Sequence, residues 1–408
     1  MISRTDAAVM DTADPLAFAR SRFSLPDGVI YLDGNSLGAL PRRTAARVAD
    51  TVTREWGERL IGSWNDAGIK DGGWIDTPAR IGAKIARLVG AAADEVIVTD
   101  TVSVNVFKLT AAALALRPGR RTIVTEAGNF PTDVYMLEGL AKLTGAELRV
   151  VADPLTALDE GVALLLLTQT HYRTGAVRDL AATTAAAHTA GALMAWDLSH
   201  STGAIAVDLT GADADMAVGC GYKFLNGGPG APAFAYVARR HHVGLDQPLT
   251  GWMGHAAPFA FEASYRPGTG MTRLLSGTPG IISMAALAAG VATFDGIDMA
   301  AAAAKSAALG DLLLALVEAR CPEMTIACPH TDRGAQVSLA HPHAYEIGQA
   351  LIARGVIGDF RPPDVLRLGL PALYTRYVDV WDAVEFLLRV LASGEWREEK
   401  FAVRGTVT

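Results

Sequence analysis

The sequence predicts an α/β fold built on a mostly parallel sheet. Up to about residue 290, short apolar segments alternate with alanine-rich helical segments, the order expected of β-α-β units. The apolar segments lack the alternation of a half-exposed strand, as is typical of parallel strands that are covered on both faces. The chain has 408 residues, 50% of them hydrophobic, so it can form a large core shared by two or three units.

Seven strands are expected in this region. They are Glu95–Thr99, Thr122–Thr125, Glu147–Val151, Val162–Thr168, Ala192–Trp196, Met216–Gly219 and Ala233–Val237. Helices are expected between them, for example over Asp179–Thr189. After about residue 290 the pattern changes, and a long Ala/Leu helix over Met299–Arg320 leads into an α+β section. We therefore expect an N-terminal arm (1–45), a large domain (46–290) and a small C-terminal domain (291–408).

Composition argues against several classes of partner. The net charge of −7 disfavours nucleic acid and anionic membranes. The three cysteines, Cys220, Cys321 and Cys328, have no Cys-x-x-Cys spacing, so neither a disulfide framework nor a zinc site is predicted. The N-terminus lacks an apolar signal segment, and no uninterrupted apolar stretch reaches the ~18 residues that span a bilayer. We expect a soluble, cytoplasmic enzyme that acts on a small molecule.

Lys223 has an unusual setting for a lysine, among apolar and glycine residues just after the predicted strand Met216–Gly219. A desolvated lysine has a lowered pKa and a usable neutral amine, whose best-known use is a Schiff base, above all with pyridoxal phosphate. Asp197, at the end of the preceding strand, could keep the pyridine nitrogen of that cofactor protonated. Singly, Lys223 could equally be a surface lysine and Asp197 a helix N-cap. Their occurrence together, with Tyr222 beside the lysine, favours the cofactor site.

Ligands of open α/β sheets bind beyond the carboxyl ends of the strands. The segment Thr101–Ser103 follows the strand that ends at Thr99, so its amides and hydroxyls could bind a phosphate at the start of a helix. An ordinary Ser/Thr helix cap fits the sequence equally well. The pairs His241-His242 and His341-Pro-His343 lie in polar segments without a third ligand at suitable spacing, so solvated histidines and no metal site are expected there.

Around Lys223 the chain resembles the kynureninases, pyridoxal-phosphate hydrolases of the class V aminotransferase superfamily with fold type I. The matching motifs extend over most of the chain: Tyr31-Leu-Asp-Gly-Asn-Ser-Leu-Gly38, Gly128-Asn-Phe-Pro-Thr-Asp133, His171-Tyr-Arg-Thr-Gly175, Trp196-Asp-Leu-Ser-His200, Gly221-Tyr-Lys-Phe-Leu-Asn226 and Arg367-Leu-Gly-Leu-Pro-Ala-Leu-Tyr374. The Asp-x-x-His and Tyr-Lys elements occur across the superfamily in looser form. The first, second and last motifs are more particular to kynureninases.

The resemblance implies that the protein hydrolyses a C–C bond. The reaction would belong to tryptophan catabolism, on the kynurenine pathway that leads to NAD biosynthesis. L-kynurenine, and also 3-hydroxy-L-kynurenine, would give anthranilate or 3-hydroxyanthranilate and L-alanine. Lys223 would link to the cofactor and remove the Cα proton, and Tyr222 would protonate the product. The alternative is another class V enzyme, a cysteine desulfurase or β-lyase, but no cysteine lies in a recognisable mobile loop. A non-catalytic relative is disfavoured by the intact lysine, aspartate and arginine.

The resemblance also assigns residues to the cofactor. The positions implied to bind its phosphate or ring, or to lie in its pocket, are Val102, Ser103, Phe130, Asp133, Thr168, Asp197, His200, Tyr222 and Lys223. Trp252 and Thr278 match positions that reach the phosphate from a neighbouring subunit, which implies a homodimer with composite active sites.

Two further features concern the substrate. Arg367 lies in an apolar, strand-like segment, where a guanidinium is costly unless it meets an anion. That anion could be Asp359 or Asp364 of the same chain or, as the resemblance implies, the α-carboxylate of the substrate. Trp64 and Thr278 stand where animal kynureninases carry histidine and asparagine, which suggests a preference for kynurenine.

Overall fold

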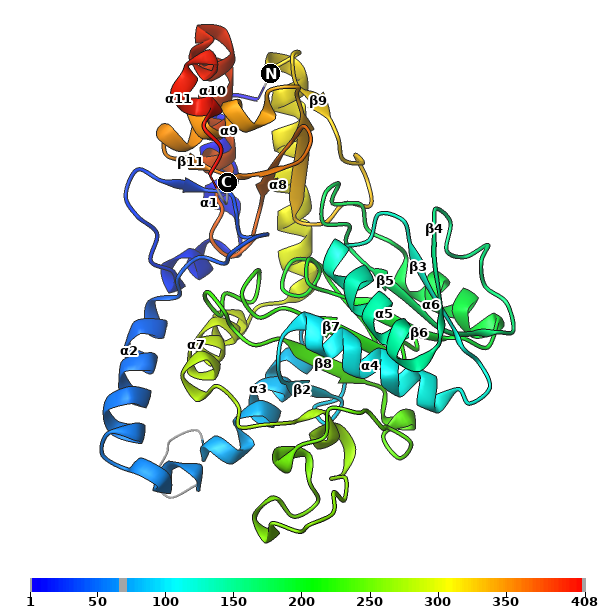
Figure 1. The fold of residues 1–408 in the computed structure, drawn as a ribbon. Helices are drawn as coiled ribbons and strands as arrows, with labels where there is room; N and C mark the ends of the chain where they lie inside the picture. Colours follow the sequence, from blue (N-terminus) through cyan, green and yellow to red (C-terminus); the bar gives the residue numbers. More distant parts are fainter. Residues whose placement is uncertain (1, 66–71, 406–408) are drawn as a thin grey trace.

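A seven-stranded sheet forms the centre of the larger part of the molecule (Figure 1). The computed structural model describes residues 2–65 and 72–405. In spatial order the strands are β2 (Val96–Val98), β8 (Phe234–Val237), β7 (Met216–Gly219), β6 (Leu193–Asp197), β5 (Val162–Thr168), β3 (Thr122–Glu126) and β4 (Glu147–Val151). Of these seven, β8 alone runs opposite to the other six. The predicted fold class and strand order along the chain are confirmed.

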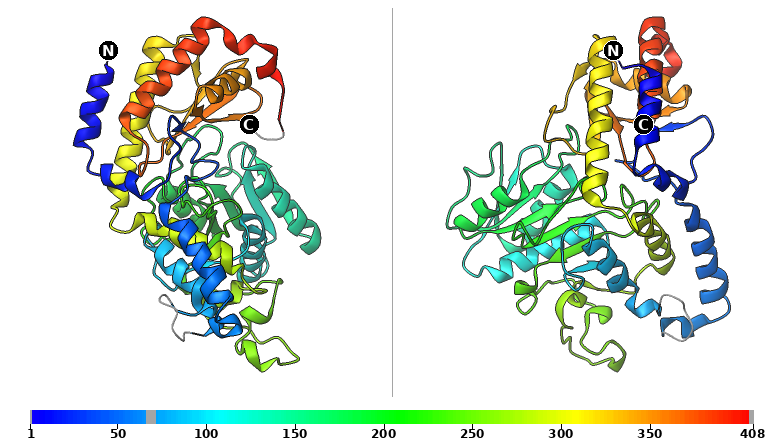
Figure 2. Two further views of the ribbon diagram at one scale, coloured as in Figure 1. Left: turned by 90° about the vertical axis from the view of Figure 1, so that its left-hand side faces the viewer. Right: turned by 180° about the vertical axis from the view of Figure 1, so that it is seen from behind.

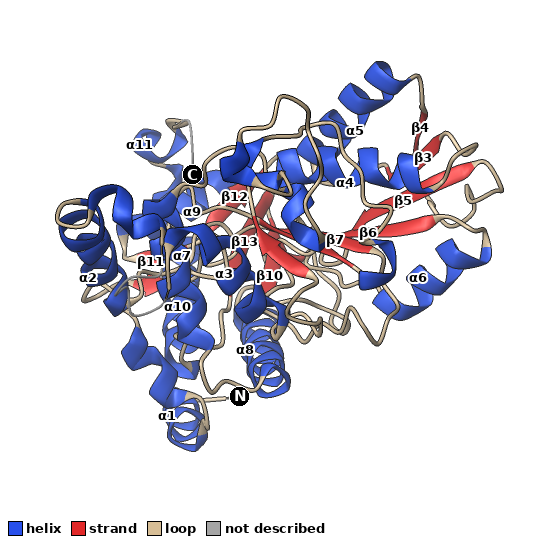
Figure 3. Cartoon of the chain, turned by 90° about the horizontal axis from the view of Figure 1, so that it is seen from below, coloured by secondary structure: helices blue, strands red, loops and turns tan. Residues whose placement is uncertain are grey.

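Helices cover both faces of this sheet, so its central strands are buried throughout. On one face α4 (Val102–Leu116) and α5 (Pro131–Thr144) pack against alternate strand residues such as Leu164 and Leu166. On the other face α3 (Thr77–Ala86), α6 (Leu180–Thr189) and α7 (Ile281–Val291) pack against the intervening residues, including Trp196. Figure 3 shows the two layers from below. Burial on both faces explains why the strands are continuously apolar in sequence.

The C-terminal part has its own core around a four-stranded antiparallel sheet. The strand order is β12 (Asp359–Arg361), β13 (Val365–Gly369), β10 (Gln336–Ala340) and β9 (Thr325–Ile326). The helices are α8 (Met299–Arg320), α9 (Ala344–Ala353), α10 (Tyr377–Ser393) and α11 (Glu399–Ala402). By length and composition α8 could cross a membrane, although the sequence shows no uninterrupted apolar run of that length. Its residues Leu309, Leu313 and Val317 are buried in this core, which explains the hydropathy of the helix.

The N-terminal segment packs on this C-terminal part and then turns toward the large sheet. α1 (Arg4–Ala13) lies against α10 (Figure 2), and β1 (Ile30–Tyr31) pairs in parallel with β11 (Val356–Ile357). The loop after β1 reaches the turn that carries Lys223: the Gly38 amide donates a hydrogen bond to the Tyr222 carbonyl at 2.8 Å. A Cβ at position 38 would lie 2.3 Å from the Lys223 carbonyl oxygen, so only glycine allows this approach. α2 (Arg42–Asp50) follows.

The expectation of solvated histidines is wrong for His241. Its side chain is buried and its Nε2 lies 2.7 Å from Oδ1 of Asp215, a carboxylate that also contacts His188 at 2.8 Å and Arg240 at 2.7 Å. These partners hold the pKa of Asp215 well below its usual value in spite of burial. The polar sequence around His241 hid this contact because Asp215 lies 26 residues earlier, at the start of β7.

Candidate active site

A cavity of about 410 Å³ lies beyond the carboxyl ends of the parallel strands. Its walls come from the segments that follow β2, β3, β5, β6 and β7. They contain all nine cofactor residues expected from one chain: Val102, Ser103, Phe130, Asp133, Thr168, Asp197, His200, Tyr222 and Lys223. The topology therefore gathers side chains from five separate segments at the sheet edge where a ligand is expected.

Lys223 lies in the turn after β7, half-buried, because one side of it faces the cavity. Its Nζ is 2.9 Å from Nε2 of His200 and 5.8 Å from the centroid of the Phe130 ring. Burial and the positive charges of Lys223 and Arg367 hold the pKa of His200 well below its usual value, so its ring is neutral. A neutral His200 can accept a hydrogen bond from the lysine.

The other nitrogen of His200 connects the site to the C-terminal part. Nδ1 lies 3.2 Å from Oε1 of Gln336, and Nε2 of Gln336 donates to the Tyr172 carbonyl at 3.1 Å. Because the amide oxygen of Gln336 can only accept, this network places the proton on Nδ1 and leaves Nε2 to accept from Lys223. Sequence reasoning missed Gln336, for which it offers no signal. Tyr172 stood in a family motif but was given no role.

Two buried carboxylates lie side by side in the cavity. Oδ1 of Asp197, the last residue of β6, accepts hydrogen bonds from the Ser199 amide at 2.8 Å and the Ser199 hydroxyl at 2.6 Å. Asp133, in the first turn of α5, is fully buried, and neither of its carboxylate oxygens has a partner within the described chain. Burial and the charge of Asp197 raise the pKa of Asp133 well above its usual value.

These residues fit pyridoxal phosphate. Asp197 would accept a hydrogen bond from a protonated pyridine nitrogen, the unmatched carboxyl of Asp133 lies beside it, and the Phe130 ring faces the same space. At the start of α4 the helix cap is Thr101, whose hydroxyl accepts from the Val104 amide at 3.3 Å. The neighbouring Ser103 hydroxyl has no protein partner among the described residues, so it and the helix amides can receive a phosphate. The cap and the phosphate site, two alternatives in the sequence, thus use different residues.

Arg367 lies outside the cavity wall, on β13, with only 1% of its side chain exposed. Its Nε and Nη2 atoms donate to the two carboxylate oxygens of Asp359, with Nε–Oδ1 at 2.7 Å. The internal ion pair predicted as one alternative is therefore present, and it involves Asp359, because Asp364 pairs with Arg173 at 2.8 Å. Nη1 of Arg367 donates to the carbonyl of Tyr172, which does line the cavity.

Trp64, Trp252 and Thr278 do not reach this cavity from their own chain. The Trp64 and Trp252 rings are 6.3 Å apart and belong to an aromatic group that includes Phe259, 5.6 Å from Trp252. Thr278 lines a separate cavity of about 290 Å³ beside Ser276. Their contribution from a second subunit stays a prediction.

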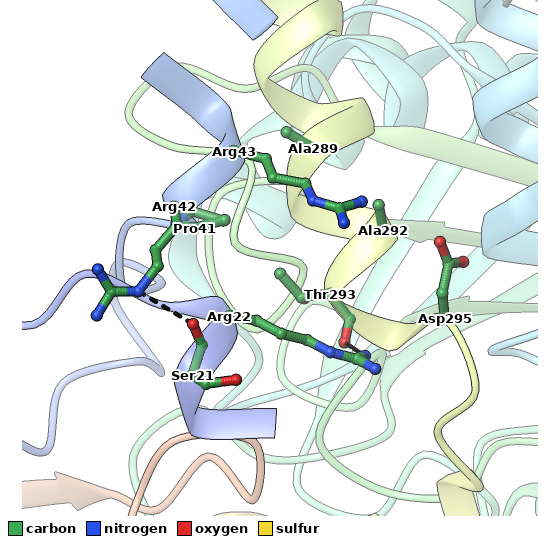
Figure 4. Close-up of a pocket in the computed structure, with 9 residues that line it drawn as sticks. All are labelled: Ser21, Arg22, Pro41, Arg42, Arg43, Ala289, Ala292, Thr293 and Asp295. Carbon is green, nitrogen blue, oxygen red and sulfur yellow. Dashed lines mark hydrogen bonds between the residues drawn. The ribbon is translucent and has the colours of Figure 1, made fainter. Parts of the chain in front are cut away.

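Another cavity, of about 370 Å³, lies between the N-terminal segment, α2 and α7 (Figure 4). Three arginines line it, Arg22, Arg42 and Arg43, of which Arg22 donates to the Thr293 carbonyl at 2.6 Å and Arg42 to the Ser21 carbonyl at 3.0 Å. It shares no residue with the Lys223 cavity, and no predicted site residue lines it.

Comparison with known sequences assigns the family. Residues 302–387 match the kynureninase C-terminal domain. The chain is 51% identical to a kynureninase of Burkholderia mallei and 47% identical to one of Pseudomonas fluorescens, in each case over the full length of both chains. The chain belongs to the kynureninase family. As a kynureninase it is a hydrolase of kynurenine that uses pyridoxal 5'-phosphate.

Solved structures confirm the fold type. The cysteine desulfurase CsdA of Escherichia coli superposes with a TM-score of 0.76 over 93% of this chain and 98% of its own, at 18% identity. A C-DES mutant with glycine linked to its pyridoxal cofactor superposes with a TM-score of 0.75 over 90% of this chain and 98% of its own, at 16% identity. At this identity the likeness concerns the fold alone. Cys321 and Cys328 are buried in the C-terminal core, and burial raises the pKa of Cys321 to about 11, so neither is placed to act as a desulfurase thiolate.

Proposed function

We propose that this kynureninase cleaves L-kynurenine to anthranilate and L-alanine in the cavity around Lys223. The observation that supports this site is the contact between Lys223 and neutral His200, in the same cavity as the neighbouring carboxyls Asp133 and Asp197. The test incubates purified protein and pyridoxal phosphate with L-kynurenine and follows anthranilate fluorescence, with L-cysteine and sulfide detection in parallel. Anthranilate without sulfide is expected; sulfide without anthranilate would contradict the assignment.

Several residues of the cavity would act in this reaction. The cofactor, when bound, supplies an electron sink conjugated to the amino nitrogen of the substrate. Lys223 would hold it covalently and carry the substrate's Cα proton, with His200 as hydrogen-bond acceptor for the free amine. Asp197, supported by Ser199, would fix the charge on the pyridine nitrogen. After water adds to the γ-carbonyl and the Cβ–Cγ bond breaks, Tyr222 would return a proton to the β-carbon.

Val102, Ser103 and the Tyr222 hydroxyl would hold the phosphate of the cofactor, and Phe130, Thr168 and Asp133 would line the space for its ring. This assignment is supported by the positions of these side chains around one cavity. Burial and the nearby Cys220 and Asp197 raise the pKa of Tyr222, so its hydroxyl stays protonated and can donate.

Arg367 is proposed to bind the α-carboxylate of the substrate. Arg367→Ala should raise KM for kynurenine by about 30-fold or more, and Arg367→Lys should not restore it, because an ammonium cannot reproduce the planar fork. Steady-state kinetics measure this, with thermal unfolding to check the fold. Arg173→Ala, which breaks the neighbouring pair with Asp364, serves as the control. Wild-type KM and kcat in Arg367→Ala would require another ligand for the carboxylate.

Trp64 and Thr278 are proposed to favour kynurenine over its 3-hydroxy derivative, since an indole leaves little polar room for a ring hydroxyl. We expect kcat/KM to be about tenfold or more higher for kynurenine. The double change Trp64→His with Thr278→Asn should shift the ratio toward 3-hydroxykynurenine. A wild-type preference for 3-hydroxykynurenine would refute the proposal.

A homodimer with composite active sites is proposed from the position of Trp252 and Thr278 outside their own cavity. Exposed apolar side chains occur in the segments next to Trp64 and Trp252, namely Leu60, Ile61, Phe259 and Phe261, as an interface requires.

Complementation between inactive chains tests the dimer. Lys223→Ala chains mixed under exchange conditions with chains carrying Trp252→Ala and Thr278→Ala should regain about a quarter of the wild-type activity, because half of the random dimers restore one of two sites. Light scattering gives the oligomeric state. Absence of recovery in mixtures that form mixed dimers would contradict shared sites.

The domain boundaries and location are also proposals. The large domain would be 46–290, the small domain 291–408 and the arm 1–45, which is supported by the separate cores of the two sheets. The arm packs chiefly on the small domain through α1 and β1. A cytoplasmic location and a place in tryptophan catabolism follow from the proposed reaction and the free cysteines.

A further inference from the structure

Two arginines share one buried carboxylate at the boundary between the two parts of the chain. Asp359 and Arg367 are directly opposite each other on the antiparallel strands β12 and β13. Arg361, two residues after Asp359, lies on the same face of β12, and its Nη2 is 2.8 Å from Oδ2 of Asp359. Asp359 is therefore held by the fork of Arg367 and by one nitrogen of Arg361 at the same time.

Ser36, from the loop after β1, completes this cluster. Its hydroxyl donates to Oδ2 of Asp359 and accepts from Nη2 of Arg367 at 3.0 Å and Nη2 of Arg361 at 3.1 Å. The two arginines differ in access: 31% of the Arg361 side chain is exposed, against 1% for Arg367 and for Asp359. Arg361 is also fixed by a bond from Nη1 to the Phe360 carbonyl at 2.9 Å.

The charges of this cluster do not balance. Asp33, the nearest other carboxyl, has a buried oxygen without a partner among the described residues, and burial with the charge of Asp359 raises its pKa to about 8. The arginines hold the pKa of Asp359 below its usual value. At neutral pH two guanidinium groups therefore face one carboxylate and one mostly protonated acid. The excess of positive charge reaches the active site, where Arg367 and Arg361 both lower the pKa of His200. One further anion would neutralise it.

We propose that Asp359 occupies the fork of Arg367 as a placeholder for the α-carboxylate of the substrate, and that Arg361 retains Asp359 when the substrate displaces it. This inference rests on the proposed function, because it takes an α-amino acid as the ligand. After displacement Asp359 keeps Arg361 as its counter-ion and the Ser36 hydroxyl as a donor, because both contact its Oδ2 atom, whereas Oδ1 gives up its bond from Nε of Arg367. Arg361 is thus a positioning residue that acts through Asp359. The exchange avoids leaving either Arg367 or Asp359 buried without a counter-ion.

The test measures binding without hydrolysis. The holoenzyme is titrated with L-alanine and with L-alaninamide, which lacks the carboxylate, and Kd is read from the absorbance of the cofactor. Arg361→Gln should raise Kd for L-alanine by about tenfold or more and leave Kd for L-alaninamide within about twofold. Arg361→Lys should restore much of the affinity, because Arg361 offers Asp359 a single nitrogen. Arg367→Lys, which loses the fork, should not.

Asp359→Asn should change Kd for L-alanine in the opposite direction and is the more decisive variant. A neutral amide competes less for Arg367, so Kd for L-alanine should fall several-fold. Thermal unfolding of each holoenzyme shows whether the variant is folded. If Asp359→Asn does not fold, the proposal is tested with Arg361→Lys. Weaker L-alanine binding in folded Asp359→Asn, or equal losses for both ligands in Arg361→Gln, would overturn the exchange. If wild-type enzyme releases no anthranilate, the proposed function fails instead, whereas the exchange is judged by the ratio of the two Kd values.

Discussion

Replacing Lys223 with alanine is expected to lower kcat for L-kynurenine by about 10⁴-fold or more, the upper range for a single proton-transfer group. The expectation rests on geometry: among the described residues Lys223 is the lysine that lines the cavity, and its Nζ lies 2.9 Å from neutral His200 and 5.8 Å from the centroid of the Phe130 ring. Its loss removes both the covalent attachment point of the cofactor and the base for the Cα proton. Borohydride reduction of the wild-type holoenzyme followed by peptide mapping should place the pyridoxyl group on Lys223.

Lys142 and Lys108 offer matched controls for this experiment. Lys142 is exposed on α5, and Lys142→Ala should leave kcat unchanged. Lys108 is buried, but its Nζ is saturated by Asp100 at 2.6 Å, the Leu274 carbonyl at 2.6 Å and Ser276 at 2.8 Å, so it should not be labelled. A pyridoxyl group on another lysine, or near-normal turnover of a folded Lys223→Ala enzyme, would require a different assignment.

Replacing Asp197 with alanine should lower kcat by roughly 100-fold to 1,000-fold, while a good part of the cofactor is retained through the phosphate contacts. Asp197 is fixed by two hydrogen bonds from Ser199, so its remaining oxygen can hold charge on the pyridine nitrogen. Without that charge the ring is a poor electron sink. Stopped-flow absorbance and kcat for kynurenine measure the loss, and cofactor content is determined separately.

The neighbouring Asp133 can compensate in part for the loss of Asp197. Its pKa is raised by burial and by the charge of Asp197, so removal of Asp197 allows Asp133 to ionise and to replace part of the lost charge. The double change Asp133→Asn with Asp197→Ala should therefore be worse than Asp197→Ala alone. Near-normal turnover in the double variant would show that neither carboxyl acts on the cofactor ring.

Much of the fold follows from local sequence. The strands were predictable to within one residue at each end, because continuous apolar runs such as Val162–Thr168 are required wherever helices cover both faces of a sheet. α8 likewise spans the predicted Met299–Arg320. The nine residues that the family resemblance implied for the cofactor line one cavity, because they lie at or just after the carboxyl ends of parallel strands or in the first turns of the following helices.

Other features depend on contacts between distant segments. The sequence left two anions of the chain open as partners of Arg367, and the antiparallel register of β12 and β13 selects Asp359 by placing it directly opposite. The sequence predicted a solvated His241, whereas the fold places Asp215, directly before β7, in contact with it. Gln336 carries no local signal, since its contact with His200 joins segments 136 residues apart.

The sequence by itself determined the fold class, through periodicity, and the cofactor, through family motifs, and it predicted the residues that line the cavity at the strand ends. The tertiary structure decided how charges are paired: which carboxyl holds Arg367, that Arg361 and Ser36 share it, and that Asp133 lies buried beside Asp197. The physical reason is that Coulomb and hydrogen-bond energies depend on distances of a few ångströms and on burial, which the spacing of residues along a chain does not specify.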